Sequence, residues 1–352
     1  MSVTLRKRLC FSILMAAFYL LGCQLILPLR GDLGREVIQQ SLVSSSRFFA
    51  GDFGRLSLFS LGLGPWLSAL LVWQLLSLDK KSALARLGKE RSDRWSLRVT
   101  LLLAFLQAFW LGSGLALSDR LWLVFYLTVG HFILIFLCDL NTVKGLGGPS
   151  LFILLGLIRE ALDQGLVWPD FLLILAIYLP LILVWERARY QIPLRKILLP
   201  IKARQQARID LPTLPASSLP LVYAMTMLSF MRLPQDSWLL SYNILAVLLN
   251  ALLAFVYYNP KRLAKKLEAA NEYIPGYQPG QATARYWAGI LKKQILTSSL
   301  YLMAFSLIPF LIWPQSKISF SPTSLAILIG ILLQVQDQVH TLQLHHKMKG
   351  YF

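Results

Sequence analysis

The sequence has few charged residues. Only 15% of its 352 residues are Asp, Glu, Lys or Arg, whereas 56% are hydrophobic and the mean hydropathy is +0.57. Soluble domains carry about 25% charged residues, so this composition excludes an ordinary water-soluble protein. Acidic residues are the scarcer kind, 17 against 35 basic ones, which leaves a net charge of +18. That charge would suit a nucleic-acid partner, but its distribution along the chain indicates a different use.

Residues that carry catalysis or bind metals are also scarce. The three cysteines lie in or beside apolar runs and form no CxxC pair, as is typical of inert thiols: Cys10, Cys23 and Cys138. His131 stands alone in an apolar run, where a packed interior residue is expected rather than a ligand. The other three histidines do not share one helix face: His340, His345 and His346. The glycine-rich segment 145–150 lacks the Lys of a phosphate loop. We therefore expect no enzymatic activity, no metal and no cofactor.

Long apolar runs are what the sequence has in abundance. A transmembrane helix needs about 20 apolar residues, and ten such runs lie at 9–29, 56–78, 99–118, 121–138, 148–162, 169–185, 216–231, 238–258, 294–313 and 322–343. The first run has no A-x-A-like cleavage site, so we expect it to stay as a span. The sequence predicts an all-α polytopic membrane protein with ten transmembrane helices.

Basic residues predict the orientation of these spans. With ten spans both termini and three large loops fall on one side, which then holds 27 of the 35 Lys and Arg residues. Cytoplasmic loops carry such an excess, so we expect both termini to be cytoplasmic. Charge is almost missing from the membrane interior, apart from Arg159, Glu160 and Asp337 near span ends. One charge there costs about 3 kcal/mol or more and marks ion pathways, so an ion-coupled porter is disfavoured.

The stretch 48–76 is interrupted by helix breakers. Gly51 and Gly54 precede a long apolar run that contains Gly62, Gly64 and Pro65. Glycine costs about 1 kcal/mol and proline about 3 kcal/mol inside a helix. Membrane helices tolerate such breaks where protein or a cavity satisfies the backbone. The stretch is therefore either a kinked, buried helix or a broken helix at a transport pathway.

Two basic loops, 187–208 and 259–293, are candidates for binding a partner. They can serve as topology determinants that contact anionic lipid, or as a docking face for a soluble protein. The length of 259–293, and the prolines and glycines that shape it into a defined hairpin, favour docking: Pro260, Pro275, Gly276, Pro279 and Gly280. On the opposite side, the Ser-rich segment 35–55 is either a surface loop or a segment that folds back into a cavity.

Several motifs resemble one family. GRLSLFSLGLGPWLSALLVWQLL (54–76) is similar to the second span of the SecY family, the bacterial relatives of the Sec61 α-subunit. NPKRLAKKLEAANEYIPGYQPGQATARY (259–286) resembles that family's loop between spans eight and nine. LPLVYAMTM (219–227), VWERARYQIPL (184–194) and SPTSLAILIG (321–330) resemble its seventh span, the end of its sixth and the start of its tenth. These matches run in order over nearly the whole chain.

The resemblance implies a protein-conducting channel built from two inverted halves, 1–162 with spans 1–5 and 163–352 with spans 6–10. A plug at about 44–54 would close it from outside, through Phe48, Phe49, Ala50, Gly51, Phe53 and Gly54. A ring of aliphatic side chains would seal the waist: Leu63, Leu67, Ile153, Leu157, Val222 and Ile327. A lateral gate to lipid would involve Ser68, Gln74 and Thr226. The loops 187–208 and 259–293 would dock a motor through Arg187, Arg189, Lys261, Arg262, Gln278 and Arg285.

The resemblance also implies partners: a SecE-like small membrane subunit, often a SecG-like one, a SecA-type motor ATPase, unfolded secretory polypeptide and the lipid bilayer, without direct nucleic-acid binding. Some positions depart from the family pattern. Tyr190, Gln191 and Gln278 stand where the family usually has arginine, and the family's GIGNGIS is shortened to GLGGPS at 145–150. These departures indicate an accessory-type SecY paralogue with few substrates. A divergent housekeeping SecY is the alternative, and a secondary transporter or a YidC-like insertase are competing classes.

Overall fold

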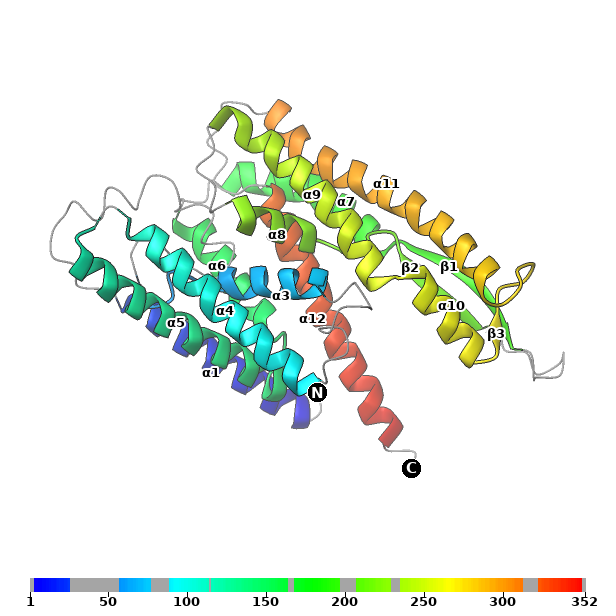
Figure 1. Ribbon diagram of the computed structural model, residues 1–352, viewed down its shortest axis with the longest axis horizontal. Coiled ribbons are helices and arrows are strands. Elements are labelled where there is room, and N and C mark those ends of the chain that lie inside the picture. Colours follow the sequence, from blue (N-terminus) through cyan, green and yellow to red (C-terminus); the bar gives the residue numbers. More distant parts are fainter. Residues whose placement is uncertain are drawn as a thin grey trace. The chain divides into compact units, whose positions relative to one another are not determined.

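The computed structural model describes residues 3–25, 57–76, 89–113, 115–163, 168–196, 207–228, 235–312 and 322–349. The chain is mostly helical (Figure 1) and divides into two compact units. Unit 1 comprises Met1–Phe171, Met225–Gln235 and Ile318–Phe352, and unit 2 comprises Leu172–Ala224 and Asp236–Lys317. The predicted halves 1–162 and 163–352 stay a prediction. The helix of the predicted tenth span belongs to unit 1, together with the helices of the predicted spans 1–5.

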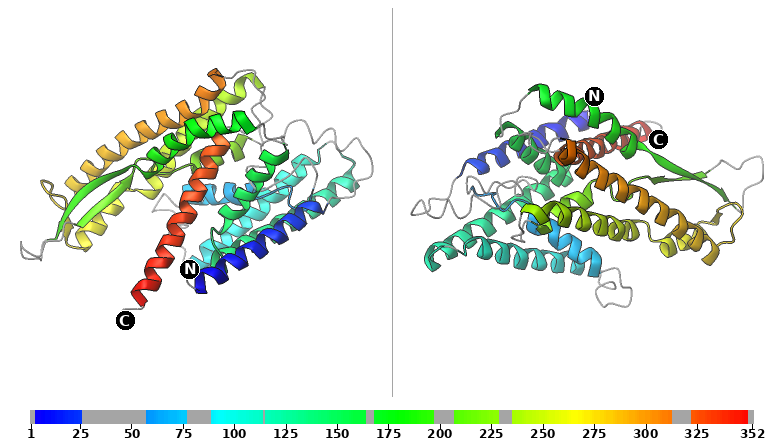
Figure 2. Two further views of the ribbon diagram at one scale, coloured as in Figure 1. Left: turned by 180° about the vertical axis from the view of Figure 1, so that it is seen from behind. Right: turned by 90° about the horizontal axis from the view of Figure 1, so that it is seen from above.

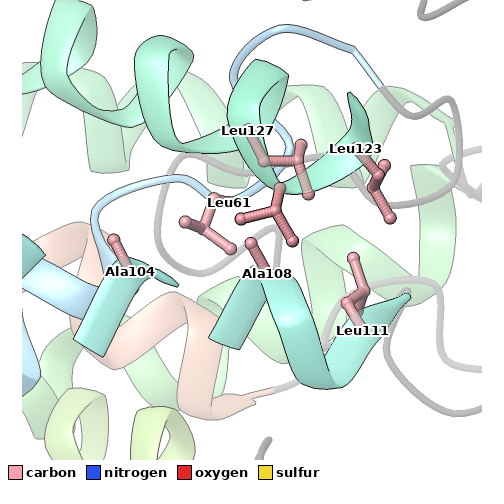
Figure 3. Packing of buried hydrophobic residues seen from close by; sticks show 7 residues of the cluster. Leu61, Ala104, Ala108, Leu111, Leu123 and Leu127 are labelled. Carbon is pink, nitrogen blue, oxygen red and sulfur yellow. The ribbon is translucent and has the colours of Figure 1, made fainter. Parts of the chain in front are cut away.

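The helices of unit 1 pack around one long central helix. They are α1 (Val3–Gln24), α3 (Gly64–Leu76), α4 (Lys89–Leu111), α5 (Leu117–Lys144), α6 (Pro149–Asp163) and α12 (Pro322–Lys349). α5 contacts α1, α4 and α6, while α12 packs against α6. Between α4 and α5, Ala104 and Ala108 lie against Leu123 and Leu127, with Leu61 at their side (Figure 3). The small alanine side chains let the two helices approach closely.

α5 is apolar on its exposed face as well as on its buried face. Leu123, Leu127 and Leu134 are buried, yet Trp122 and Phe136 are exposed. A helix that is apolar all round is either enclosed by protein or surrounded by lipid. Because only 44% of its apolar stretch is buried by the part of the chain that the structure describes, the helix is suited to a bilayer.

Each of the ten predicted apolar runs overlaps a helix. Within the described residues, two stretches are long and apolar enough by length and composition to cross a membrane, Leu117–Lys144 and Leu239–Ala269. Gly64–Trp73, Pro149–Arg159 and Leu219–Leu228 are shorter apolar helices. The number of ten spans therefore stays a prediction.

Unit 2 combines helices with a small sheet. It holds most of α7 (Trp168–Arg187), the first half of α8 (Leu219–Leu228), α9 (Gln235–Tyr257), α10 (Pro260–Ala269) and α11 (Gln281–Ile312), together with β1 (Arg189–Lys196), β2 (Ala207–Pro212) and β3 (Glu272–Tyr273). The strands are antiparallel in the order β2-β1-β3, and they lie beside α10 and α11 (Figure 2). The all-α prediction is corrected here, because two segments expected to be loops pair as strands.

Buried polar side chains link α9 to α11. The Asn250 amide donates hydrogen bonds to Ser298 Oγ (2.7 Å) and Ser299 Oγ (3.0 Å). About two turns away the Ser306 hydroxyl donates to Asn243 Oδ1. The bonded residues are seven apart on α9 and seven or eight apart on α11, so they lie along one face of each helix. They fix the antiparallel register of the two helices within an apolar layer.

Candidate functional site

The break predicted in 48–76 is present. Residues 57–63 form a turn, in which Gly62 has a φ of 57°, and α3 begins only at Gly64. Pro65 follows at a first-turn position, where proline is tolerated because that amide has no helical partner. The predicted interruption before α3 is therefore present, and its place at a transport pathway stays a prediction.

Two neighbouring helices hold the 57–63 turn in place. His131 of α5, completely buried, donates from Nδ1 to the Gly62 carbonyl oxygen over 2.7 Å. At Gly130 the contact is so close that an added Cβ would lie 1.8 Å from the Leu58 carbonyl oxygen. On the other side the Leu58 amide donates to the carbonyl of Leu25, at the end of α1 (2.9 Å). The sequence predicted His131 as a packed interior residue, which is confirmed, but gave no sign of its partner.

The six residues of the predicted ring are all buried. Leu63 directly precedes α3 and Leu67 lies in its first turn, where the Leu67 amide donates to the Leu63 carbonyl over 3.0 Å. Ile153 and Leu157 lie on α6 and Ile327 on α12, the helix that packs against it, all in unit 1. Val222 lies on α8 in unit 2. Burial is expected both of a closed constriction and of ordinary packing, so the ring stays a prediction.

The predicted lateral gate and plug are covered only in part. Ser68 is buried on α3, and within the described residues its hydroxyl has no hydrogen-bond partner. Thr226 is buried on α8. The side chain of Gln74 and the whole plug, residues 44–54, lie outside the described residues. Both assignments stay predictions.

The turn between α5 and α6 joins four helices of unit 1. The buried Asn141 amide donates to the carbonyls of Leu146 (2.8 Å) and Gly148 (3.0 Å), and its Oδ1 accepts from Ser12 of α1 (2.9 Å). The Gly147 amide donates to Gln338 Oε1 of α12 over 2.9 Å. The start of α1 and the later part of α12 therefore lie at the same end of unit 1, as expected of a chain whose termini share one side of a membrane.

The two predicted docking loops form one structural region. β1 and the start of β2 come from the first loop, beyond which β2 continues to Pro212, and α10, β3 and the start of α11 come from the second. We call this the sheet region and define it as residues 187–196, 207–212 and 258–293. Its core is made of six buried side chains: Ile192, Leu194, Leu211, Leu267, Ile274 and Trp287. The six residues predicted for docking are all exposed around this core. The sequence did not predict the pairing, and docking itself stays a prediction.

The second loop has the defined shape that its prolines and glycines predict. Asn259 caps α10 by accepting from the amides of Lys261 (3.1 Å) and Arg262 (3.2 Å), with Pro260 as the first helical residue. After β3, Pro275 and Gly276 lie at the centre of a turn closed by the Tyr277 amide and the Ile274 carbonyl (3.1 Å). Gly276 has a φ of 87°, as a type II turn requires.

Among the residues that the structure describes, no group of three His, Cys, Asp or Glu side chains is arranged to hold a metal.

Comparison with known proteins gives consistent matches over the chain. The SecY family model matches residues 57–336. An accessory Sec system protein translocase subunit SecY2 of Streptococcus salivarius is 27% identical over 398 residues, covering 98% of this chain and 97% of the relative. A protein translocase subunit SecY of Aquifex aeolicus is 28% identical over 417 residues, covering 99% and 96%.

The fold is similar to that of solved channels. A structure of a protein-conducting channel matches with a TM-score of 0.69 at 15% identity, covering 97% of this chain and 93% of that one. Sec61 in a canine ribosome–channel complex matches with a TM-score of 0.64 and the same coverage. At this identity the likeness concerns the fold alone.

Proposed function

Because the chain belongs to the SecY family, we propose that it is the central channel subunit of an accessory-type protein translocase. It passes unfolded secretory polypeptide across the cytoplasmic membrane and releases hydrophobic segments sideways into lipid. The observation that carries this proposal is the end-to-end match to SecY2 subunits of accessory Sec systems. The channel performs no chemistry of its own, and a motor supplies the energy.

A divergent housekeeping SecY is the second candidate. The Aquifex SecY has about the same identity to this chain as the streptococcal SecY2 proteins. The departures at Tyr190, Gln191 and Gln278 favour the accessory role, because all three are exposed on the sheet region and therefore available to a partner. A small-solute transporter has no support from the family match.

The proposed assembly follows from the family. A SecE-like subunit, and a SecG-like one in many members, would accompany the channel in the cell membrane. Both termini and the sheet region would face the cytoplasm, where a SecA-type ATPase docks. The shared end of α1 and α12 supports this placement of the termini, and the basic loops of the sheet region support its side.

Reconstitution tests the proposal. Vesicles that contain the chain, its small subunit and its motor ATPase are expected to protect an added secretory precursor from protease only when ATP is present. Vesicles without the chain are the control. Uptake of a small solute along an ion gradient, without any cross-link between the chain and a precursor polypeptide, would contradict the proposal.

A further inference from the structure

Two exposed aromatic residues stand out in the sheet region. Most exposed large hydrophobic side chains of unit 2 are on α9 and α11, along stretches predicted to face lipid. Tyr190 of β1 and Tyr277 of the turn after β3 are 49% and 41% exposed in a region predicted to lie in water. Tyrosines exposed in this way on a polar surface are enriched in protein–protein interfaces.

These tyrosines belong to one cluster. The ring of Tyr277 packs on that of Tyr286 of α11, with ring centroids 4.1 Å apart and an interplanar angle of 31°. The side chain of Tyr286 is also hydrogen-bonded to that of Tyr190. Burial, together with these two neighbours, raises the pKa of the Tyr286 hydroxyl. We call Tyr190, Tyr277 and Tyr286 the tyrosine cluster; its members come from three different elements.

The fold fixes the positions of the three tyrosines in the unbound chain. Tyr190 follows the alternation of β1, so it lies on the same sheet face as the core residues Ile192 and Leu194. Tyr277 is set by the type II turn at Gly276. The buried Thr283 hydroxyl donates to the Gln278 carbonyl over 2.8 Å and ties that turn to α11. A rigid aromatic surface loses little conformational entropy on binding.

Charge indicates the chemistry of the partner. The sheet region has twelve basic and three acidic residues, and Arg189 and Arg285, both exposed, directly precede two of the tyrosines. A complementary partner surface is therefore acidic. Single-stranded nucleic acid binds such surfaces by stacking bases on free aromatic faces, but the rings of Tyr277 and Tyr286 already pack on each other at a tilt of 31°. These features favour an acidic protein over RNA.

We propose that the tyrosine cluster, with its basic surroundings, is the anchor by which this channel binds an acidic surface of its cytosolic motor ATPase. The proposal rests on the proposed function and adds to it the residues that determine which motor binds. Aromatic anchors contribute most of the binding energy in such interfaces, while exposed charges at the rim contribute little. Binding should therefore tolerate salt better than a contact made by ion pairs alone.

The test uses the full chain with its small subunit in vesicles, and SecA-type ATPases purified from the same organism. Binding is measured at 0.1 M and 0.5 M NaCl, because added salt screens exposed charges. We expect Tyr190→Ala with Tyr277→Ala to weaken binding at least tenfold at both salt concentrations. Tyr190→Phe with Tyr277→Phe keeps the rings and is expected to stay within about threefold of wild type. Trp95→Ala is the matched control, since Trp95 is 45% exposed on α4 and outside the cluster.

Two further measurements separate a failure of this proposal from a failure of the proposed channel function. A photoreactive phenylalanine in place of Tyr277 should cross-link to the ATPase, which tests the site without removing the ring. Unchanged binding of the alanine variant, or cross-linking to ribosomes or a second copy of the chain instead, overturns the proposal. If wild-type vesicles protect the precursor in the same experiment, the channel function stands whichever way the cluster behaves.

Discussion

At the scale of single residues, the start of α3 depends on how closely α5 approaches the turn before it. Gly130→Ala would place a Cβ 1.8 Å from the Leu58 carbonyl oxygen, where backbone on both sides has to move. We expect this variant to lose about 1–3 kcal/mol of stability, as in other overpacked interiors. The thermal unfolding midpoint of the purified chain, followed by tryptophan fluorescence, measures the loss.

Gly289→Ala is the matched control. Gly289 lies in α11 and an added Cβ there would meet nothing within 4 Å. Alanine is the better helix former by about 1 kcal/mol, so this variant should be neutral or more stable. A Gly130→Ala protein as stable as Gly289→Ala would show that α5 does not hold the turn.

At the scale of elements, α9 and α11 are joined by side chains rather than by close backbone packing. Asn250→Ala removes both hydrogen bonds to Ser298 and Ser299. A double-mutant cycle with Ser298→Ala and Ser299→Ala is expected to give a coupling energy of about 0.6–1.7 kcal/mol, the range found between membrane helices. Leu248→Ala, on an exposed face of α9, should show no coupling with the serines. Equal coupling for Leu248 would argue against a specific link.

Sequence patterns predicted some elements well and missed the contacts between them. The break before α3 could be predicted because Gly62, Gly64 and Pro65 limit the backbone conformation at their own positions, whatever the rest of the chain does. The turn after β3 could be predicted for the same reason. The pairing of β1 with β3 joins residues more than 70 positions apart. The alternation of apolar residues in β1 and β2 is short, and Pro193 and the flanking basic residues made these segments resemble loops. The hydrogen bond from His131 to Gly62 could not be predicted either, because a single histidine in the sequence does not indicate which carbonyl accepts its hydrogen bond.

At the scale of the whole molecule, the proposed aliphatic seal is tested through the ion conductance of the closed channel. Replacing Leu67 and Val222 by serine should wet an aliphatic constriction that otherwise excludes ions. We expect the double variant to raise the resting ion conductance of planar bilayers, with a larger rise after deletion of 44–54. Leu101→Ser with Leu102→Ser on α4 is the control, because both side chains are exposed. If the Leu67 and Val222 variant conducts no more than wild type, even without residues 44–54, the ring assignment is wrong.

The hydrogen bond between Gly147 and Gln338 has a consequence for biogenesis. Its two residues are 191 positions apart, which at about 5–20 residues per second of synthesis is a delay of about 10–40 s. During that interval α1, α5 and α6 are already made, but the helix that packs against α6 does not yet exist. Unit 2, which comprises Leu172–Ala224 and Asp236–Lys317, lies wholly within this gap, so all its segments are synthesised before α12. Unit 1, which contains the N-terminal helices, is therefore completed last. Until α12 is synthesised, the apolar surface that α12 will contact must be covered by another protein or by lipid.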